Sequence, residues 1–382
     1  MLSSGSWNWR REKNLGGSRD NRLLRILHVD LERNWGGGEA QVLGLLSYLA
    51  AKGHHNDLLA HPSGLLFARC QSLDVRARPM VMRNDLDVRC VLPLRRLIHQ
   101  MRYNIVHFHT KRAHTLALWL PHGKRRPKYV VTRRMDYPES RTWYTRCLYN
   151  RRVDGVVAIS QTIARLLLSA GVDKGKIRCI SSGIELRTFE NIRTRRTGAD
   201  DVTEIGCLAG LEERKGHRYL LEAAALLKAD GLKVRYQIAG DGPLRAQLEA
   251  DVNRLRLRDE VCFLGFITDT AGFFAGVDLF AMPSLYEGLG VAALEAMAAG
   301  KAVVATHVGG LTESVLEGVT GFLVPPRDSV ALAAAIAKLA RSRSLARAMG
   351  QQGRARVRQH FSLQNMARQN ESYYRELLSA PS

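Results

Sequence analysis

The fold is decided by one stretch of the sequence, residues 283–300, which reads PSLYEGLGVAALEAMAAG. Short apolar runs lie on either side of it, Leu279–Met282 before and Ala302–Thr306 after, and both have the length of buried strands. Between them, the glycines predict a loop and the apolar residues that follow predict a helix. A strand, a loop, a helix and a second strand in this order predict a parallel sheet covered by helices.

The same alternation runs through both halves of the 382 residues. Further strands are expected at Leu23–Val29, Ile105–Phe108, Tyr129–Thr132, Gly155–Ile159, Ile177–Ile180, Glu204–Ala209, Val234–Ala239, Val261–Leu264 and Phe322–Val324. Further helices are expected at Glu39–Ala51, Thr162–Ala170, Tyr219–Ala229, Ser329–Arg341 and Gln364–Leu378. We therefore expect the α/β class, with two doubly wound Rossmann-like domains that face a cleft. Ligands of such domains bind beyond the carboxyl ends of the strands.

Composition sets the expected domain boundaries. Residues 1–21 form a polar leader that lacks the apolar core of a signal peptide. Residues 22–189 form the first domain and residues 202–363 form the second. Between them, residues 190–201 are polar and charged, which is typical of a linker. Residues 364–382 form a C-terminal helical segment.

Two carboxylates in the deciding stretch point to a binding site. Glu287 lies in the glycine loop, and Glu295 lies just over two helical turns further on. The amides of Gly288–Gly290 open the helix, where a phosphate would be stabilised. A carboxylate beyond that phosphate can accept hydrogen bonds from sugar hydroxyls, and one further along can hold a ribose diol. An unpaired charge is costly in an apolar helix, which favours a bound polar partner over a capping Glu287 and a solvated Glu295.

A second glycine loop, Gly36-Gly37-Gly38-Glu39, follows the first strand and opens a helix. Its backbone could approach a phosphate because no Cβ atoms intervene, although a tight strand-to-helix turn explains it equally well. Lys215 lies in the corresponding loop of the second half. It could neutralise a diphosphate leaving group, although a lysine at the surface would look the same.

The tripeptide His107-Phe108-His109 ends a strand that points toward the expected cleft. Alternation along the strand places both imidazoles on one face. A neutral imidazole there could bind a sugar hydroxyl or a carbonyl oxygen, so His109 is a candidate catalytic residue. The alternative is a histidine whose hydrogen bonds are satisfied within the structure. No further ligands appear at a spacing that suits zinc, so no metal is predicted.

The net charge of +21 is unevenly distributed. Residues 1–190 contain 33 basic and 15 acidic side chains, whereas residues 191–382 contain 24 and 21. An excess of this kind suits nucleic acid, an anionic membrane surface or an anionic substrate. Apolar side chains near the basic residues of 95–134 favour an anionic membrane interface. They are Leu94, Leu97, Ile98, Trp119, Leu120, Trp143 and Tyr144.

Taken together, these motifs resemble a known family. From about Leu23 to Leu378 the sequence is similar to glycosyltransferase family 4, the retaining GT-B class called "glycosyl transferases group 1". The most specific part of the resemblance is the run Pro283–Glu313. The other matching segments are Val153–Phe189, Lys215-Gly216, Gly240–Pro243 and Gly321–Asp328.

This resemblance implies transfer of a sugar from a UDP-sugar or GDP-sugar to a glycan or lipid-linked acceptor, with retention and without a metal or another cofactor. It implies that Glu287 contacts the donor sugar and that Glu295 holds the ribose. It implies that the first domain binds the acceptor and that the last helix crosses back onto that domain. The remaining implied donor contacts are Lys215, Gly288, Leu289 and Gly290 at the diphosphate, Gly37 and Gly38 from the first domain, and Phe266 and Ile267 at the base.

The sequence departs from the family pattern at two places. Gly210 stands where an arginine is common, which shifts the diphosphate charge onto Lys215, helped by Arg214. Arg134 stands where a histidine often lies near the reacting sugar, and a guanidinium cannot act as a base. Arg134, Asp136 and Glu39 are the candidate acceptor-side contacts, with His109 as an alternative to Asp136.

Lipopolysaccharide or envelope polysaccharide assembly is the expected pathway. Six dispersed cysteines and the lack of an export signal predict the cytoplasm, at the inner face of the cytoplasmic membrane. Two other classes were weighed. A nucleotide-sugar epimerase or hydrolase of the same fold is disfavoured by the basic first domain. A nucleic-acid-binding protein is disfavoured because no recognition motif accompanies the charge, so no nucleic acid is predicted as a partner.

Overall fold

The computed structural model of the chain describes residues 22–85, 87–123, 126–137, 139–190, 192 and 202–380. The expected polar leader, residues 1–21, lies outside them. So does the expected linker, residues 190–201, apart from residues 190 and 192. Within the described residues, no helix combines the length and the apolar character needed to cross a bilayer.

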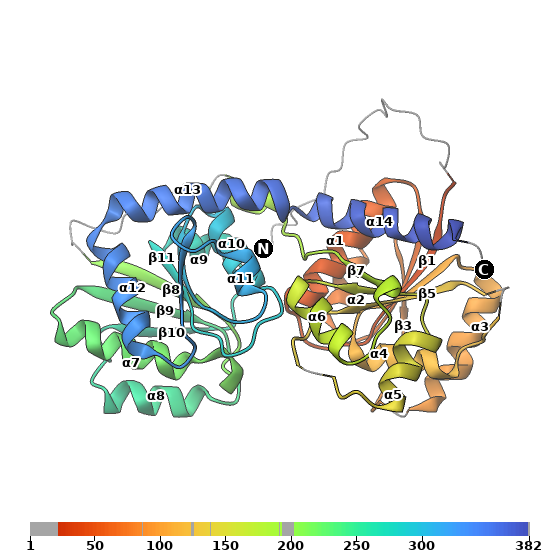
Figure 1. The fold of residues 1–382 in the computed structure, drawn as a ribbon, viewed down its shortest axis with the longest axis horizontal. Coiled ribbons are helices and arrows are strands. Elements are labelled where there is room, and N and C mark those ends of the chain that lie inside the picture. The colour runs from red at the N-terminus through yellow and green to blue at the C-terminus, as the bar shows by residue number, and fades with distance from the viewer. Residues whose placement is uncertain are drawn as a thin grey trace.

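Two parallel β-sheets form the centres of two domains that lie side by side (Figure 1). The first sheet has seven strands in the order β3-β2-β1-β4-β5-β6-β7, and the second has six in the order β10-β9-β8-β11-β12-β13. The first seven strands are β1 Arg25–Asp30, β2 His55–Ala60, β3 Arg76–Pro79, β4 Ile105–Phe108, β5 Lys128–Arg133, β6 Gly155–Ala158 and β7 Ile177–Cys179. The other six are β8 Thr203–Leu208, β9 Val234–Ala239, β10 Val261–Gly265, β11 Leu279–Met282, β12 Ala302–Thr306 and β13 Gly321–Val324.

Helices cover both sheets, as the α/β alternation requires. In the first domain they are α1 Gly37–Ala51, α2 Leu65–Cys70, α3 Val91–Met101, α4 Lys111–Thr115, α5 Trp143–Arg146 and α6 Gln161–Ser169. The second half contributes α7 His217–Ala229, α8 Arg245–Arg254, α9 Thr270–Ala275, α10 Val291–Ala298, α11 Leu311–Ser314, α12 Ser329–Arg341, α13 Arg343–His360 and α14 Leu363–Ser379. The predicted fold class is therefore confirmed.

Several elements were not expected from the sequence, and three of them carry many polar residues. The strand β2 buries Asn56 and Asp57, and the Tyr103 hydroxyl donates a hydrogen bond to the Asp57 carboxylate at 2.5 Å. The edge strand β3 reads RARP and is only partly buried. Of the 18 residues of α13, only four are buried, so its apolar stripe is too narrow to stand out. The other helices that the sequence did not predict are α2, α3, α4, α5, α8, α9 and α11.

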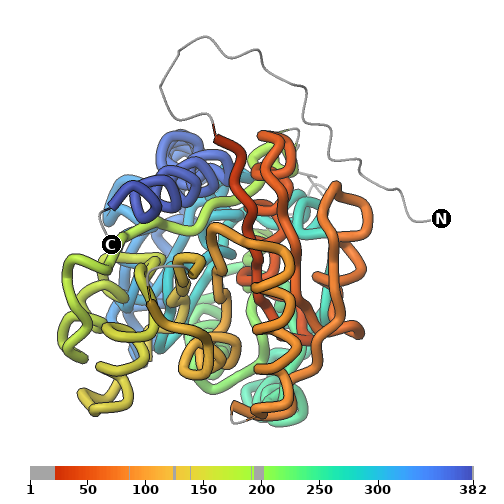
Figure 2. The backbone as a smooth tube through the Cα atoms, turned by 90° about the vertical axis from the view of Figure 1, so that its right-hand side faces the viewer, coloured from red at the N-terminus to blue at the C-terminus, as the bar shows by residue number. Residues whose placement is uncertain are grey.

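The final helix lies along the first domain rather than the second (Figures 1 and 2). It packs beside α1, where a Cβ atom on Gly44 would come within 2.2 Å of the Leu363 side chain. The Tyr374 hydroxyl lies 2.6 Å from Nδ1 of His107 in β4. The Tyr373 hydroxyl donates a hydrogen bond to the carbonyl oxygen of Lys176 at 2.8 Å. The C-terminus therefore ties the two domains together a second time.

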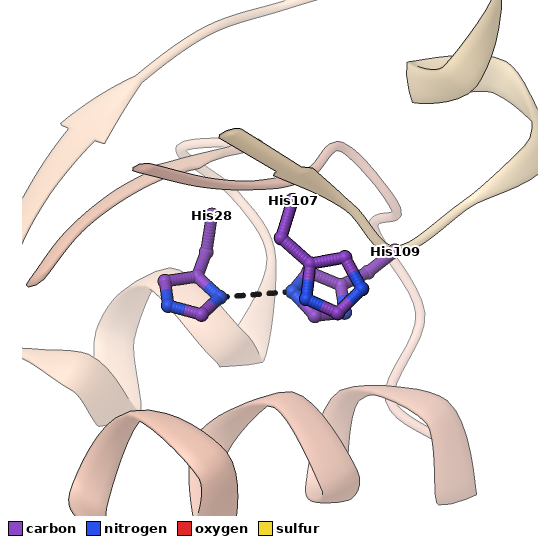
Figure 3. Close-up of side chains that lie close together, drawn as sticks. All are labelled: His28, His107 and His109. Atoms are coloured by element: carbon purple, nitrogen blue, oxygen red, sulfur yellow. Dashed lines mark hydrogen bonds between the residues drawn. The ribbon is translucent and has the colours of Figure 1, made fainter. Parts of the chain in front are cut away.

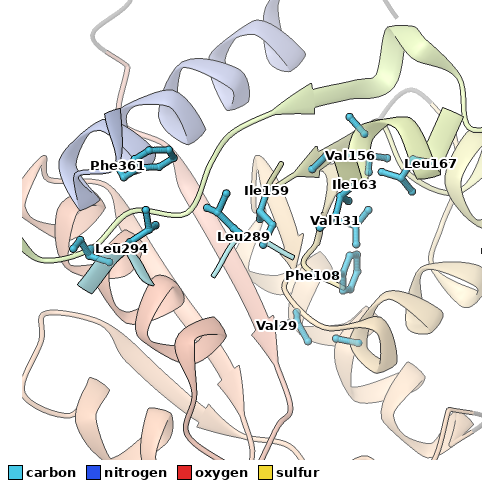
Figure 4. Close-up of a cluster of buried hydrophobic side chains, with 14 of the residues drawn as sticks. Val29, Phe108, Val131, Val156, Ile159, Ile163, Leu167, Leu289, Leu294 and Phe361 are labelled. Carbon is cyan, nitrogen blue, oxygen red and sulfur yellow. The ribbon is translucent and has the colours of Figure 1, made fainter. Parts of the chain in front are cut away.

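One apolar cluster continues from the first domain into the second (Figure 4). Val131 and Val156 belong to the first sheet, and Ile159 follows β6. Leu289 and Leu294 of the second domain are buried in the same cluster. The surfaces at which the two domains meet are therefore partly dry and apolar, which favours a defined relative position.

Backbone atoms of the two domains approach each other closely at this junction. A Cβ atom on Gly288 would lie 2.2 Å from the carbonyl oxygen of Arg134, so only glycine fits there. The Glu313 carboxylate of the second domain accepts hydrogen bonds from the amides of Gln161 and Thr162 at 2.8 and 2.9 Å. These amides open α6 of the first domain, and a carboxylate is stabilised at a helix N-terminus.

The close approach at Gly288 predicts the effect of Gly288→Ala. The added methyl group has to push the Arg134 carbonyl away, so the domains separate locally. We expect a loss of about 1–3 kcal/mol in unfolding free energy, measured by denaturant titration. We also expect a larger proportional loss of activity. Gly175→Ala is the control, because its Cβ would meet its nearest neighbour at an ordinary 3.6 Å. Equal stability of the two variants would contradict the junction described here.

Candidate active site

The two sheets present their topological switch points to the junction between the domains. In the first sheet the strand order reverses between β1 and β4, and in the second it reverses between β8 and β11. Loops that follow such strands diverge and leave room for a ligand. The candidate residues of both domains lie in these loops or in loops beside them, which is why segments far apart in the sequence meet here.

Lys215 and Glu287 form the centre of the second-domain site. Lys215 follows β8 and is 9% exposed, and Glu287 follows β11. Lys215 Nζ lies 2.5 Å from Glu287 Oε2, which makes an ion pair between two mostly buried side chains. The carbonyl oxygen of Arg214 accepts a hydrogen bond from the Leu285 amide at 2.8 Å. The two loops are therefore held together by both backbone and side chains.

The amides at the start of α10 are free of side-chain caps. Gly290 is the N-cap residue, with a φ of +83° that glycine adopts readily, and no side chain caps the helix. The Leu289 side chain is buried in the apolar cluster, so only its backbone can face a donor. The Gly288–Gly290 segment thus presents backbone N–H groups beside the Lys215–Glu287 pair, an arrangement that suits a phosphate.

Glu295 lies on α10, beyond that N-terminus. Burial raises the pKa of its carboxyl group to about 7. No hydrogen bond or ion pair to the Glu295 carboxylate occurs within the described residues. The ionised form of such an enclosed carboxylate is stabilised when ligand hydroxyls donate hydrogen bonds to it, because these bonds replace those that water would make.

The other expected donor contacts differ in how accessible they are. The Phe266 ring is 57% exposed just after β10, so its face is open to a base. Ile267 instead packs against the apolar cluster. The Arg214 guanidinium is held by Glu212, with Nε 2.6 Å from Oε2. Arg214 is therefore partly neutralised before any ligand binds.

The first-domain glycine loop faces α10 and Arg134. A Cβ atom on Gly37 would lie 3.2 Å from the Val291 side chain, the first residue of α10. A Cβ atom on Gly38 would lie 3.5 Å from Cδ of Arg134. Glu39 caps its own helix, because its Oε2 accepts a hydrogen bond from the Gly36 amide at 2.7 Å. The capping role explains Glu39 without an acceptor contact.

Arg134 is enclosed between the two glycine loops. Its guanidinium forms no hydrogen bond or ion pair within the part of the chain that the structure describes. Burial lowers the pKa of Arg134, while the charges of Asp30 and Glu39 oppose that shift. Burial, together with the Glu39 charge, raises the pKa of Asp30 to about 7. Sequence reasoning missed Asp30, although its place as the last residue of β1 was an available signal.

The sequence made Asp136 a candidate acceptor-side contact, but in the structure its carboxylate is already engaged by the other domain. Its carboxylate accepts a hydrogen bond from the backbone amide of Glu287, and burial raises its pKa. Its Oδ2 lies 3.2 Å from where a Cβ atom of Gly309 would be. Asp136 therefore links the two domains by a hydrogen bond to the loop that contains Glu287, because the loops after β5 and β11 meet at the junction.

His109 is buried and lines a small cavity together with Arg134, and its assignment as a catalytic residue stays a prediction. It is 3% exposed, and its Nε2 lies 3.0 Å from Nδ1 of His28 (Figure 3). Burial holds the pKa of His109 well below its ordinary value. Its Nδ1 has no partner and lines a small cavity of about 10 Å³ with Ser182 and Asn370. A space of that size suits one water.

The fold also gathers three histidines that sequence spacing did not connect. His28, His107 and His109 bring ring nitrogens within 4.8 Å of one another, and all are buried. However, His107 Nδ1 already faces the Tyr374 hydroxyl, and its Nε2 faces the Thr132 hydroxyl at 2.7 Å. The positive charge of Arg134 also acts on His107 and His109, and it would oppose a cation. The cluster is best described as a network of neutral imidazoles.

Comparisons with known proteins agree with this architecture. Residues 189–356 match the family model "Glycosyl transferases group 1", and residues 35–188 match "Glycosyltransferase Family 4". A solved structure of Anabaena Alr3699/HepE in complex with UDP and glucose is similar with a TM-score of 0.79, covering 92% of this chain and 100% of that chain at 22% identity.

Among curated relatives, the lipopolysaccharide core biosynthesis glycosyltransferase LpsE of Rhizobium meliloti is 28% identical, over 94% of this chain and 100% of LpsE. The alpha-D-kanosaminyltransferase of Streptomyces kanamyceticus is 32% identical, over 48% of each chain. The chain spans about half of the length of this second relative.

Two parallel-sheet domains with facing switch points and glycine loops define the GT-B class of fold. The two family models together extend over residues 35–356. The chain belongs to glycosyltransferase family 4, the glycosyl transferases group 1.

The pKa of Glu295 leads to a prediction about stability and binding. Because folding raises this pKa from 4.5 to about 7, the ionised carboxylate destabilises the unliganded fold increasingly as pH rises through that interval. We expect Glu295→Gln to raise the free energy of unfolding at pH 8, by less than about 3 kcal/mol because residue 295 is only half-buried. The gain should vanish near pH 4.

The same substitution should weaken nucleotide-sugar binding. Affinity of the unaltered protein should rise between pH 6 and 8 as Glu295 ionises, whereas affinity of Glu295→Gln should be flat. Calorimetric titration at several pH values measures this. Glu249→Gln, which alters an exposed side chain of α8, should change neither property. A variant that lost stability at pH 8, or kept its affinity, would contradict the role given to Glu295.

Proposed function

We propose that the chain is a retaining, metal-independent glycosyltransferase that moves a sugar from a nucleotide-diphosphate sugar to a glycan or lipid-linked acceptor. Assembly of lipopolysaccharide or of an envelope or extracellular polysaccharide is the proposed pathway. The relative LpsE is named for lipopolysaccharide core biosynthesis. The observation that carries the proposal is the Lys215–Glu287 pair at the uncapped start of α10, with Glu295 further along the same helix.

Each of these groups binds a different part of the nucleotide-sugar. The diphosphate binds to Lys215 and to the amides of Gly288–Gly290. The sugar hydroxyls donate hydrogen bonds to Glu287 and replace the lysine as its partner. Glu295 accepts hydrogen bonds from the ribose. As the bond to the sugar breaks, negative charge grows on the diphosphate, where preorganised positive groups stabilise it. The chain itself supplies these groups, so no metal ion is required.

Arg134 supplies further positive charge from the first domain. Gly210 offers no side chain, and Arg214 is held by Glu212. The Arg134 side chain lies beside Gly38, and its guanidinium forms no ion pair among the described residues. We propose that it faces the diphosphate or the reacting sugar, with Asp30 beside it as a contact for an acceptor hydroxyl. The two departures from the family pattern then compensate each other.

The donor class and the location are also proposals. Solved structures of Anabaena Alr3699/HepE contain UDP and UDP-glucose, which favours a UDP-sugar over a GDP-sugar. The basic first domain favours peripheral association with the inner face of the cytoplasmic membrane, where a lipid-linked acceptor would lie. Only some of the apolar side chains expected at the membrane are exposed and able to contact it. Leu94, Ile98 and Leu120 are buried, whereas Trp119, Trp143 and Tyr144 are exposed.

A nucleotide panel tests the activity class. We expect one of UDP, GDP, ADP and CMP to raise the melting temperature of the protein, because a ligand of the folded state stabilises it. The matching nucleotide-sugar should then be consumed only when an acceptor is present, and proton coupling constants should show that the product keeps the anomeric configuration of the donor. Conversion of the donor alone would instead indicate an epimerase or hydrolase.

The lysine is tested by kinetics. We expect Lys215→Ala to lower kcat by about 100-fold, with a smaller change in KM, because its charge matters most when the diphosphate departs. Lys233→Ala removes an exposed lysine of the same domain and should leave kcat unchanged. A change in KM alone would show that Lys215 binds the donor without assisting the departure of the diphosphate.

A further inference from the structure

A second cavity lies away from the junction, on the first domain. It has a volume of about 380 Å³, within the range of small-ligand sites. Its wall is built by the segment that follows Arg134, by α5 and by the turn after α5. The residues that line it are Arg141, Thr142, Trp143, Arg146, Cys147, Asn150 and Arg151.

The three arginines of this cavity have no acidic partner. Arg141, Arg146 and Arg151 form no ion pair or hydrogen bond from their guanidinium groups within the described residues, and all three are exposed. This sets them apart from four nearby basic residues. Arg126 pairs with Asp154, Arg112 with Asp85, and both Lys111 and Arg133 with Glu139. Three uncompensated positive charges around one cavity favour an anion that carries phosphate.

The backbone helps to converge the arginines. In an α-helix, residues five apart point about 140° apart around the axis. Here Cys147–Arg151 is a π-helical turn, closed by a hydrogen bond from the Arg152 amide to the Cys147 carbonyl oxygen at 3.1 Å. A π-helical turn brings residues five apart closer to one side, and Arg146 and Arg151 have this spacing.

The floor of the cavity is fixed by neighbouring loops. The Asn150 side chain donates a hydrogen bond to the carbonyl oxygen of Gly171 and accepts one from the Asp173 amide, both at 2.9 Å. Arg141 and Arg146 pack over Gly171, whose φ of +84° is in the region that favours glycine. A Cβ atom there would lie 3.6 Å from Nε of Arg141. The arginine stems are thus held in place while their charged ends remain in solvent.

Aromatic side chains at the same place indicate where the phosphate comes from. The Trp143 side chain lines the cavity and is 76% exposed, and its neighbour Tyr144 is 44% exposed. A small soluble phosphate would leave these rings in water. At a bilayer surface, tryptophan and tyrosine rings are stabilised in the interfacial layer, at the depth of the lipid phosphates.

We propose that this cavity binds the phosphate-bearing headgroup of an anionic membrane lipid, with Trp143 and Tyr144 entering the interface beside it. The proposal rests on the membrane association proposed above and gives it a specific site. Thr142 at the cavity comes eight positions after Arg134 at the junction. Headgroup binding would therefore set the orientation of the active site toward a lipid-linked acceptor.

The test compares two triple variants that remove the same charge. One carries Arg141→Gln, Arg146→Gln and Arg151→Gln. The control carries Arg341→Gln, Arg347→Gln and Arg358→Gln, which alter exposed residues of α12 and α13. Co-sedimentation is measured with vesicles of phosphatidylcholine alone and with added phosphatidylglycerol. At about a fivefold loss for each surface arginine that contacts lipid phosphate, at most about a 150-fold and at least about a fivefold weakening is expected for the cavity variant only.

Trp143→Ala separates the lipid from a soluble ligand. It should weaken vesicle binding by at least threefold while the melting temperature stays unchanged. Equal vesicle binding by the two triple variants would overturn the proposal, and so would equal binding to neutral vesicles. Saturable binding of glycerol 1-phosphate to the cavity without vesicle binding would show that the bound phosphate does not come from a membrane lipid. The nucleotide-induced rise in melting temperature, measured on the same samples, reports the proposed transferase function separately.

Discussion

The domains of this protein meet through backbone, and the absence of one Cβ atom at Gly288 makes that possible. The Arg134 carbonyl oxygen occupies the space that any other side chain would need. This approach fixes the loop after β5 against the loop after β11. It places the Arg134 side chain beside Gly38, and it lets the Asp136 carboxylate accept a hydrogen bond from the Glu287 amide. The site is therefore assembled by packing between domains, which places charged groups more accurately than long flexible side chains would.

Electrostatic cost is concentrated where ligands would bind. Among the described residues, the Glu295 carboxylate and the Arg134 guanidinium have no ion-pair partner, and Asp30 lies close enough to Glu39 for the two negative charges to repel each other. Each of these groups is destabilised in the unliganded protein, and each would be stabilised by hydroxyls or phosphate. Elsewhere the structure pairs its buried charges, as with Asp57 and Arg78 or Arg126 and Asp154. This difference marks the junction as the functional region more clearly than any single residue does.

Basic residues of the first domain differ in whether a carboxylate pairs with them. Lys111, Arg112, Arg126 and Arg133 contribute to the net charge but are paired with carboxylates, so they act mainly on the structure. Arg141, Arg146 and Arg151 are unpaired and converge on one cavity beside an exposed tryptophan. Net charge counted along the sequence cannot separate these parts, because ion pairs form between segments that are distant in the chain.

The sequence by itself determined the α/β class and most strands, including β4, β9, β11 and β12 at their observed bounds. Apolar runs and glycine loops are local patterns, so they can be read without knowing what packs on them. It also marked Glu287, Glu295 and Lys215, because the charges stand in apolar or glycine-rich surroundings. Only the tertiary structure decided that Lys215 pairs with Glu287, that His109 turns inward to His28, and that Asp30 and Arg134 share one enclosure. Burial and partnership depend on which strands become neighbours, and the order of strands in a sheet is a property of the whole fold.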